Sequence, residues 1–332
     1  MSSSSAHVVE DCRGALQVMS DGTVRRRAEP PPTPDVVRDD GCGVEWRDVT
    51  WEPEHGLNVR LFRPRHHHLG GGGARRIPVV AYFHGGGFCI GSGRWPNFHA
   101  WCLRLAAELP ALVLSFDYRL APEHRLPAAH EDGAKAMSWL LSAADPWLSD
   151  DDDAAADFSR VFIAGDSAGG NIAHHVAAAV GTSGLGPGTR VRGSLLIAPA
   201  MAGEAWTRSE LECPPDAVLT PEMCKRFMRL TLPDGWTWDH PVISPAGPLA
   251  LGLEDVDMVP VLVVAGGRDL LRDRNRQYAR RMGEEWGKEV EYVEVAGADH
   301  AFFLMDAWSE HADELVGVMR RFVSDHMESP TT

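Results

Sequence analysis

Gly165-Asp166-Ser167-Ala168-Gly169-Gly170 is the run from which both the fold class and the chemistry of this chain can be predicted. It has the pattern Gly-x-Ser-x-Gly, and it lies between an apolar strand expected at 160–165 and a helix expected at 169–180. In that context the glycines allow a sharp strand-to-helix turn, which holds the serine in a strained, exposed position. The Ser167 hydroxyl is then expected at the carboxyl edge of a sheet, beside the N–H groups of the helix start. The alternative is a glycine-rich turn with an incidental serine.

Apolar strands and helices alternate on both sides of this turn. The expected strands are 77–83, 111–116, 160–165, 191–198, 259–265 and 290–295, and the expected helices are 98–109, 131–143, 169–180, 269–286 and 309–326. Strands that are apolar throughout are buried on both faces, so the pattern predicts an α/β fold with a mostly parallel sheet between two layers of helices. Before them, a hairpin around Asp21-Gly22 and two strands at 44–51 and 58–62 are expected. The segment of about 200–250, rich in Trp, Met and Pro, interrupts the alternation and is predicted to be an inserted cap.

A serine hydroxyl is a weak nucleophile and needs a general base. Asp269 follows the expected strand 259–265, and His300 follows the expected strand 290–295, so both are predicted at the same sheet edge as Ser167. The chain order Ser, Asp, His is that of the α/β-hydrolase triad. We predict that His300 takes the Ser167 proton while Asp269 orients the imidazole. Asp273, one helical turn further on, is the alternative acid.

The run His84-Gly85-Gly86-Gly87-Phe88 directly follows the strand expected at 77–83. Glycine in such a loop lets backbone N–H groups approach a substrate without a Cβ in the way. We predict that the N–H groups of Gly86, Gly87 and Ala168 form an oxyanion hole, with Gly85 as a substitute for one of the glycines. The alternative is a flexible glycine loop.

The overall composition excludes several classes of protein. Lys and Arg number 32 against 47 Asp and Glu, a net charge of −15, so neither a nucleic acid nor an anionic membrane surface is an expected partner. No apolar run approaches the roughly 18 residues of a membrane-spanning helix. The six scattered cysteines and the lack of a secretory signal favour the cytosol, with the nucleus as an alternative. The consecutive histidines 66–68 point in different directions, so no metal site is predicted.

Three motifs together resemble the hormone-sensitive-lipase family of α/β-hydrolases: the runs at 84–87 and 165–170, and Asp117-Tyr118-Arg119-Leu120-Ala121-Pro122-Glu123. Within that family the chain is most similar to plant carboxylesterases of the carboxylesterase 15 subgroup. That finer resemblance rests on the segments 10–17, 88–92, 95–99 and 270–274. It implies hydrolysis of strigolactones, a class of lactone hormones. The family also implies a cap built from residues 1–45 and the insertion, over a core of residues 46–332.

The resemblance leaves three functions open. The preferred one is a serine carboxylesterase that cleaves apolar esters or lactones through an acyl-enzyme, with no metal or organic cofactor. Gibberellin receptors share the fold and keep the serine but lack the catalytic histidine, so His300 favours an enzyme. A hydroxyisoflavanone dehydratase of the same branch retains the triad and stays an alternative. The expected partner is a small-molecule substrate, and the chain is expected to be a monomer or a homodimer.

Aromatic and methionine side chains near these motifs and in the insertion suggest an apolar, adaptable pocket. Each of them could instead pack between cap and core. The candidate pocket residues are Phe88, Trp95, Trp206, Met223, Phe227, Phe302 and Phe303.

Overall fold

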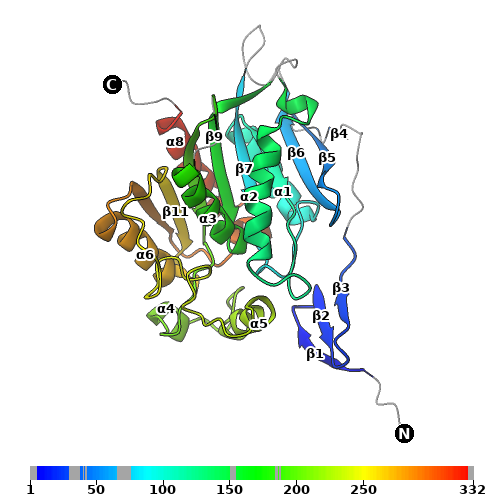
Figure 1. Ribbon diagram of the computed structural model, residues 1–332, viewed down its shortest axis with the longest axis vertical. Coiled ribbons are helices and arrows are strands. Elements are labelled where there is room, and N and C mark those ends of the chain that lie inside the picture. The colour runs from blue at the N-terminus through cyan, green and yellow to red at the C-terminus, as the bar shows by residue number, and fades with distance from the viewer. Residues whose placement is uncertain are drawn as a thin grey trace.

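The computed structural model describes residues 6–29, 38–39, 41, 43–65, 76–149, 155–183, 186 and 188–327. The histidine run at 66–68 therefore lies outside the described residues. Within the described part of the chain, nine strands form one sheet in the order β12-β11-β10-β9-β7-β8-β6-β5-β4 (Figure 1). These strands are β4 (Arg38–Asp39), β5 (Val44–Glu52), β6 (Leu57–Pro64), β7 (Ile77–Phe83), β8 (Leu112–Phe116), β9 (Ala156–Asp166), β10 (Val191–Ile197), β11 (Val261–Gly266) and β12 (Val290–Val295).

The six strands from β12 to β8 run parallel, whereas β6, β5 and β4 pair antiparallel at one edge. Every residue of β7, β8 and β11 is buried, because helices cover both faces of the sheet. One face packs against α2 (Ala128–Leu141), α3 (Ala168–Ser183) and α6 (Arg272–Arg280), and the other against α1 (Pro96–Glu108) and α8 (Glu310–Asp325). The predicted α/β fold, with its mostly parallel sheet and two helical layers, is confirmed.

Most of the predicted elements agree with the structure to within a few residues. The helix expected at 269–286 differs mainly at its start, because α6 begins only at Arg272. α6 ends at Arg280, and the π-helix η3 (Arg281–Glu285) continues it almost to the predicted end. Between β11 and α6 the chain makes a tight turn, in which the N–H of Asp269 donates to the carbonyl of Gly266 at 3.1 Å. This turn leaves Asp269 outside the helix, at the carboxyl edge of the sheet.

The N-terminal residues form a small sheet of their own. The predicted hairpin is present as β2 (Leu16–Met19) paired with β3 (Val24–Arg26), and β1 (Val8–Asp11), which the sequence did not predict, adds a third strand. Glu10 forms ion pairs with Arg226 and Arg229 of α5 (Pro221–Thr231), which belongs to the predicted insertion. The N-terminal sheet and the insertion are therefore linked to each other.

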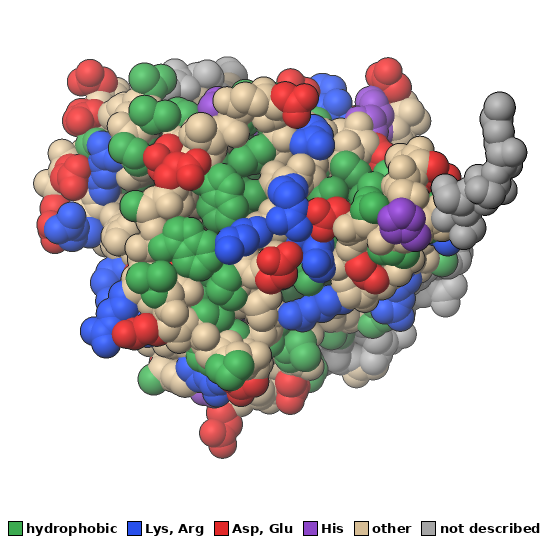
Figure 2. Space-filling view, turned by 90° about the horizontal axis from the view of Figure 1, so that it is seen from below, with side chains coloured by type: hydrophobic (Ala, Val, Ile, Leu, Met, Phe, Trp, Pro, Cys, Tyr) green, Lys and Arg blue, Asp and Glu red, His purple; other side chains and the backbone are tan. Residues whose placement is uncertain are grey.

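The small sheet, α4 (Arg208–Leu211) and α5 lie beyond the carboxyl ends of the strands. Figure 2 shows this side of the molecule, where hydrophobic side chains gather beside a group of Lys and Arg side chains despite the net negative charge of the chain. Trp206 and Leu211 are among the exposed hydrophobic residues in this part of the chain. No helix in the described ranges is both long and apolar enough to cross a membrane.

Candidate active site

Ser167 occupies a strained turn between β9 and α3. Its φ is +50°, in the left-handed region that non-glycine residues rarely adopt. Only glycine fits at the two positions that flank this turn. A Cβ on Gly165 would lie 2.3 Å from the carbonyl oxygen of Gly169, and a Cβ on Gly169 would lie 2.0 Å from the carbonyl oxygen of Phe83. The Ser167 N–H donates to the carbonyl of Ile197 at 2.9 Å, which anchors the turn to β10. The sharp turn expected from the Gly-x-Ser-x-Gly pattern is therefore present.

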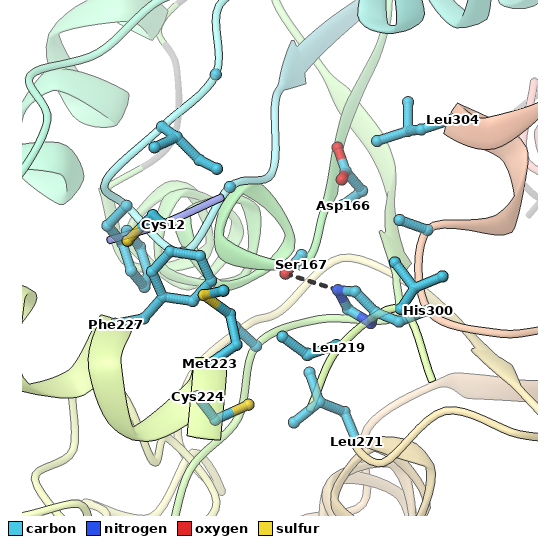
Figure 3. A pocket seen from close by; sticks show the side chains of 18 of the residues that line it. Cys12, Asp166, Ser167, Leu219, Met223, Cys224, Phe227, Leu271, His300 and Leu304 are labelled. Carbon is cyan, nitrogen blue, oxygen red and sulfur yellow. Dashed lines mark hydrogen bonds between the residues drawn. The ribbon is translucent and has the colours of Figure 1, made fainter. Parts of the chain in front are cut away.

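The structure brings Ser167, His300 and Asp269 into one hydrogen-bonded chain, of which Figure 3 shows the contact between Ser167 and His300. The Nε2 of His300 lies 3.1 Å from the Oγ of Ser167, and its Nδ1 lies 2.7 Å from Oδ2 of Asp269. A carboxylate only accepts hydrogen bonds, so Asp269 favours the tautomer with a proton on Nδ1, which leaves Nε2 free to accept the serine proton. The Asp269 carboxylate is held in turn by the N–H of Leu271, at 2.9 Å from Oδ1.

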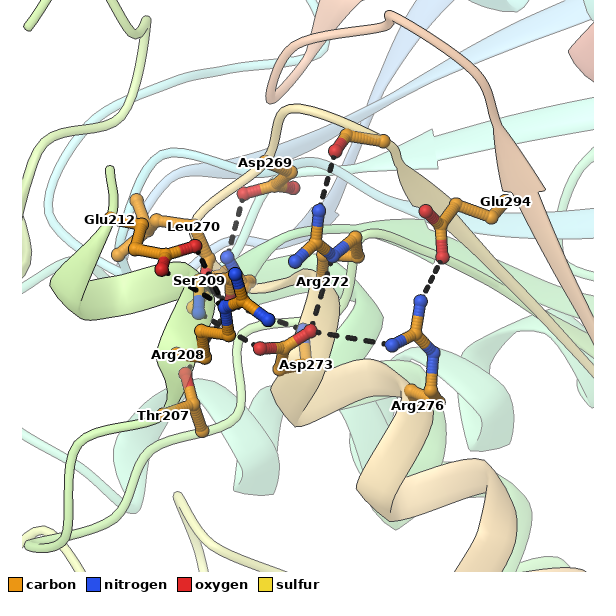
Figure 4. Close-up of polar contacts among 12 residues, drawn as sticks. Thr207, Arg208, Ser209, Glu212, Asp269, Leu270, Arg272, Asp273, Arg276 and Glu294 are labelled. Carbon is orange, nitrogen blue, oxygen red and sulfur yellow. Dashed lines mark hydrogen bonds and ion pairs between the residues drawn. The ribbon is translucent and has the colours of Figure 1, made fainter. Parts of the chain in front are cut away.

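Asp273, the alternative acid, faces another part of the molecule (Figure 4). Its carboxylate accepts the N–H of Ser209 at 2.8 Å and pairs with Arg272 and Arg276. Asp273 thus ties the start of α6 to the predicted insertion, and the carboxylate on the histidine is that of Asp269. Asp299, which precedes His300, accepts the backbone N–H of His300 at 2.8 Å, so its carboxylate is engaged by the main chain.

The charge state of His300 depends on two opposing effects. Burial disfavours the imidazolium and lowers the pKa of His300, while the carboxylate of Asp269, aided by those of Asp166 and Asp299, favours the imidazolium. The carboxylates prevail, so the pKa of His300 is raised above its ordinary value of 6.5. The same carboxylates stabilise the positive charge that His300 acquires when it takes a proton.

This shift predicts the pH dependence of turnover. A histidine that accepts a proton must be neutral, so kcat/KM is expected to fall as the pH drops through the raised pKa, with its midpoint above pH 6.5. The measurement is kcat/KM for an uncharged ester in steps from pH 5 to pH 9, after checking that the protein stays folded throughout. A flat profile, or a midpoint below pH 6.5, would contradict the role of His300 or the direction of its pKa shift.

Two glycines present their backbone to the same cavity as Ser167. Gly86 and Gly87 have φ of +115° and +60° and both line the cavity. A Cβ on Gly86 would lie 1.9 Å from the carbonyl oxygen of Ile90, so no other residue fits there. Ala168 is the first residue of α3, and its N–H is one of those that a helix leaves without an intrahelical acceptor.

Gly85 differs from the prediction. Its N–H donates to Oδ1 of Asp166 at 2.9 Å, so this group is already engaged and does not substitute for Gly86 or Gly87 in this conformation. The reason is that Gly85 lies directly against the strand end that carries Asp166, one residue before the loop turns toward the cavity.

The cavity beside Ser167 has a volume of about 270 Å³ and mostly apolar walls. Four of the predicted pocket residues line it: Phe88, Trp95, Met223 and Phe227. The cavity is also lined by residues that were not predicted, among them Cys12, Met201, Leu219, Cys224, Leu271 and Leu304. They come from widely separated segments, and only their apolar character was visible in the sequence.

Three predicted pocket residues do not line the cavity. Trp206 is 37% exposed, and the ammonium group of Lys225 lies 4.8 Å from the centre of its ring. Phe303 is fully buried in the opposite layer of the core, with its ring 4.5 Å from that of Trp101. Phe302 packs beside Phe303 in the same cluster. The left-handed backbone of Ala301 turns the chain after His300, which directs both phenylalanines into the core.

The polar groups around the site have structural partners. Asp117 accepts the N–H of Gly93 and pairs with Arg94, which secures the segment after the glycine loop. Cys89 is fully buried, and burial raises the pKa of its thiol well above the ordinary value, as expected for an inert thiol.

Among the described residues, the one cluster with the spacing of metal ligands is Glu52, Glu54 and His55. It lies in the turn between β5 and β6, outside the cavity. Glu52 there already accepts the N–H groups of Glu54 and His55, so its carboxylate serves the turn.

Known proteins with similar sequences and structures show the family of this chain. A family model described as the α/β-hydrolase fold matches residues 80–304. The chain is 35% identical over 302 residues to probable carboxylesterase 6 of Arabidopsis thaliana, covering 90% of this chain and 85% of that protein. It is 33% identical over 319 residues to 2-hydroxyisoflavanone dehydratase of Glycyrrhiza echinata, covering 93% and 94% of the two chains.

A solved structure supports the same assignment. EstE1, a thermostable carboxylesterase cloned from a metagenomic library, matches with a TM-score of 0.72 and 30% identity over 86% of this chain and 90% of that one. The chain therefore belongs to the α/β-hydrolase family and is a carboxylesterase-type member of it.

Proposed function

We propose that this protein is a serine carboxylesterase that hydrolyses apolar esters or lactones through an acyl-enzyme. The observation that carries the proposal is the hydrogen-bonded chain from Ser167 through His300 to Asp269, set in the wall of an apolar cavity. A nucleophile, a base and an orienting acid in this arrangement can perform acyl transfer with no further group.

The proposed reaction has two steps. In the first, the Oγ of Ser167 bonds to the ester carbonyl carbon as His300 takes the serine proton. The N–H groups of Gly86, Gly87 and Ala168 stabilise the oxyanion. The bond to the alcohol oxygen then breaks, and the alcohol leaves with the proton from His300. In the second step His300 takes a proton from water, the hydroxide attacks the acyl carbon, and the acid is released as Ser167 regains its proton.

We further propose strigolactones as the natural substrates. The segments that resemble the carboxylesterase 15 subgroup supply much of the cavity wall, which supports this choice. Residues 10–17 contribute Cys12 and Arg13, and 270–274 contribute Leu271. The segment 88–92 after the glycine run contributes Phe88, Ile90 and Gly91, and the segment 95–99 at the start of α1 contributes Trp95, Asn97 and Phe98. A lactone of moderate size and low polarity suits such walls, because burial of apolar surface drives its binding.

One experiment separates the ester hydrolase from its alternatives. Purified protein is given a short-chain chromogenic ester and, separately, a synthetic strigolactone whose products are followed by mass spectrometry. Cleavage of both supports the whole proposal, and cleavage of the ester alone removes the strigolactone. If the folded protein cleaves neither, the esterase is wrong. Ligand-dependent partner binding would then indicate a receptor, and dehydration of a hydroxyisoflavanone would indicate a dehydratase.

The oxyanion loop is expected to be sensitive to Gly87→Ala. The new Cβ would lie 2.4 Å from the ring of Phe227, and φ of +60° disfavours alanine, so the loop must shift. Since losing one oxyanion donor costs about 100- to 1000-fold, kcat for a short-chain ester is expected to fall at least about 100-fold. Gly56→Ala is the control, because Gly56 has a similar φ of +65° with nothing within 4 Å, in the turn between β5 and β6. Equal activity of the two variants would exclude Gly87 from the oxyanion hole.

We also propose that the protein works in the cytosol, as a monomer or a homodimer. The described cysteines Cys12, Cys89, Cys102, Cys213 and Cys224 are free thiols, the state that a reducing compartment maintains. Light scattering after gel filtration measures the oligomeric state, and cell fractionation measures the location. A tetramer, or recovery in an organelle, would contradict these two statements without affecting the chemistry.

A further inference from the structure

Asp166 is a buried carboxyl group in the wall of the cavity that forms no bond and transfers no proton in the proposed reaction, although its charge favours the imidazolium of His300. It is the last residue of β9 and directly precedes Ser167 (Figure 3). Only 2% of it is exposed. Within the described part of the chain it forms no ion pair with a lysine or an arginine, so hydrogen bonds have to compensate its burial.

Both hydrogen bonds reach the same oxygen of Asp166, and both come from the end of β7. The hydroxyl of Tyr82 donates to Oδ1 at 2.6 Å, and the N–H of Gly85 donates to Oδ1 at 2.9 Å. Tyr82 lies in β7, and Gly85 begins the glycine loop that follows this strand. One carboxylate oxygen therefore connects the nucleophile strand to the first residue of the loop.

The approach between the two segments is close. A Cβ on Gly85 would lie 2.2 Å from Oδ2 of Asp166, so only glycine allows the loop to pass the carboxylate at this distance. The next two residues, Gly86 and Gly87, are those whose N–H groups are assigned to the oxyanion hole. Any movement of Gly85 would displace them, because they follow it directly in the chain.

We propose that Asp166 is a positioning residue, whose Oδ1 holds Gly85 and thereby fixes the oxyanion loop at the correct distance from Ser167. The inference rests on the proposed esterase function. A carboxylate oxygen suits the task because it accepts two hydrogen bonds at once, and a charged acceptor binds N–H and O–H donors more strongly than a neutral one.

The charge state of Asp166 sets the conditions of the test. Burial raises the pKa of Asp166 to about 6, against the hydrogen bond of Tyr82, the charge of His300 and the N–H of Gly85, which lower it. At pH 8 the group is therefore a carboxylate. Measurements at pH 8 thus compare the charged carboxylate of wild type with a neutral side chain at position 166.

The test compares Asp166→Ala with Asp166→Asn. Alanine removes the oxygen that accepts both hydrogen bonds. Since a misplacement of the oxyanion loop by about 1 Å can cost on the order of 100-fold, kcat is expected to fall about 100-fold. Substrate is bound by the apolar walls, so KM should stay within about threefold. The Asn variant keeps an Oδ1 acceptor for Tyr82 and Gly85 and should recover most of kcat.

A transition-state analogue provides the second readout. A trifluoromethyl ketone forms a covalent adduct with the serine whose oxyanion occupies the oxyanion hole. Its inhibition constant is expected to weaken in Asp166→Ala by about the same factor as kcat/KM, as it should if the loop is displaced. A merely structural role would lower the melting temperature and leave this affinity unchanged in the folded fraction.

Asp145→Ala is the matched control. Asp145 is also a buried aspartate that accepts one backbone N–H, from Trp147, and one side-chain donor, from Arg47, but at the opposite edge of the sheet. The Asp145→Ala variant should have a lower melting temperature than wild type and an unchanged kcat. If Asp166→Ala does not fold, Tyr82→Phe removes one of the two donors, and kcat and the analogue affinity should each fall about fivefold.

Three outcomes would overturn the proposal while wild-type esterase activity is retained. They are a folded Asp166→Ala with unchanged kcat, an Asp166→Asn as impaired as the alanine variant, and a loss confined to KM. If wild type itself hydrolyses no ester, the proposed function fails first.

Discussion

Ser167→Ala is expected to lower kcat for a short-chain ester by about 10⁶-fold, the loss seen when a triad nucleophile is removed from an enzyme of this type. Without the Oγ there is no atom to form the acyl-enzyme, and only binding and the oxyanion hole remain. The fold should persist, since alanine keeps the backbone of the turn and leaves the neighbouring glycine contacts in place.

The measurement is steady-state hydrolysis of a chromogenic ester, together with mass spectrometry of the intact protein after mixing with substrate. Wild type should gain the mass of one acyl group, and Ser167→Ala should gain none. Ser194→Ala is the matched control, because it removes another buried hydroxyl, on β10, that has no hydrogen-bond partner. Retained acylation of Ser167→Ala would show that another residue is the nucleophile.

Asp269→Asn is expected to lower kcat by about 10⁴-fold, while Asp273→Asn should change it by less than about threefold. The amide at 269 can donate to Nδ1 of His300, which favours the tautomer with its proton on Nε2 and removes the acceptor for the Ser167 proton. Asp273 instead contacts Ser209, Arg272 and Arg276.

The pH profile gives this comparison a second readout. Loss of the Asp269 charge lowers the pKa of His300, so the acidic midpoint of the remaining kcat/KM should move to lower pH, whereas Asp273→Asn should leave it in place. Similar losses of kcat in both variants would mean that the two carboxylates share the role, contrary to the hydrogen bond seen for Asp269 alone.

The site residues that could be predicted from sequence all follow apolar strands directly. Ser167, Asp269 and His300 follow β9, β11 and β12; the ends of β9 and β11 are fully buried, whereas β12 is mostly half-buried. Because these strands are parallel, their carboxyl ends meet at one edge of the sheet, and the three side chains come together although 133 residues separate Ser167 from His300. A local pattern is sufficient wherever the sheet itself supplies the long-range contact.

The choice between Asp269 and Asp273 was less secure from sequence. A helix over 269–286 would have placed the two carboxylates one turn apart on the same face of the helix. In the structure, the turn after β11 leads into α6, which begins at Arg272. Asp269 therefore lies before the helix, and Asp273 lies within it. The helix boundary, which residue patterns locate poorly, therefore decides which acid reaches the histidine.

The apolar nature of the cavity walls could be predicted from sequence, but the residues that form the walls could not. Trp206 and Met223 are both apolar residues of the same insertion, yet Met223 lines the cavity and Trp206, which is 37% exposed, lies outside it. Gly85 and Gly86 are adjacent glycines, yet the N–H of Gly85 binds Asp166 and Gly86 faces the cavity.

The parallel sheet and the three residues at its carboxyl edge could be predicted from sequence, because apolar runs, glycine turns and chain order are local properties. The side chains that enclose the cavity and the backbone amides that face it could be identified only in the folded molecule. These depend on contacts between distant segments, such as Glu10 of the N-terminal sheet with Arg226 of α5 and Asp166 with Gly85. The direction in which a side chain points is set by such contacts, and residue type alone does not reveal it.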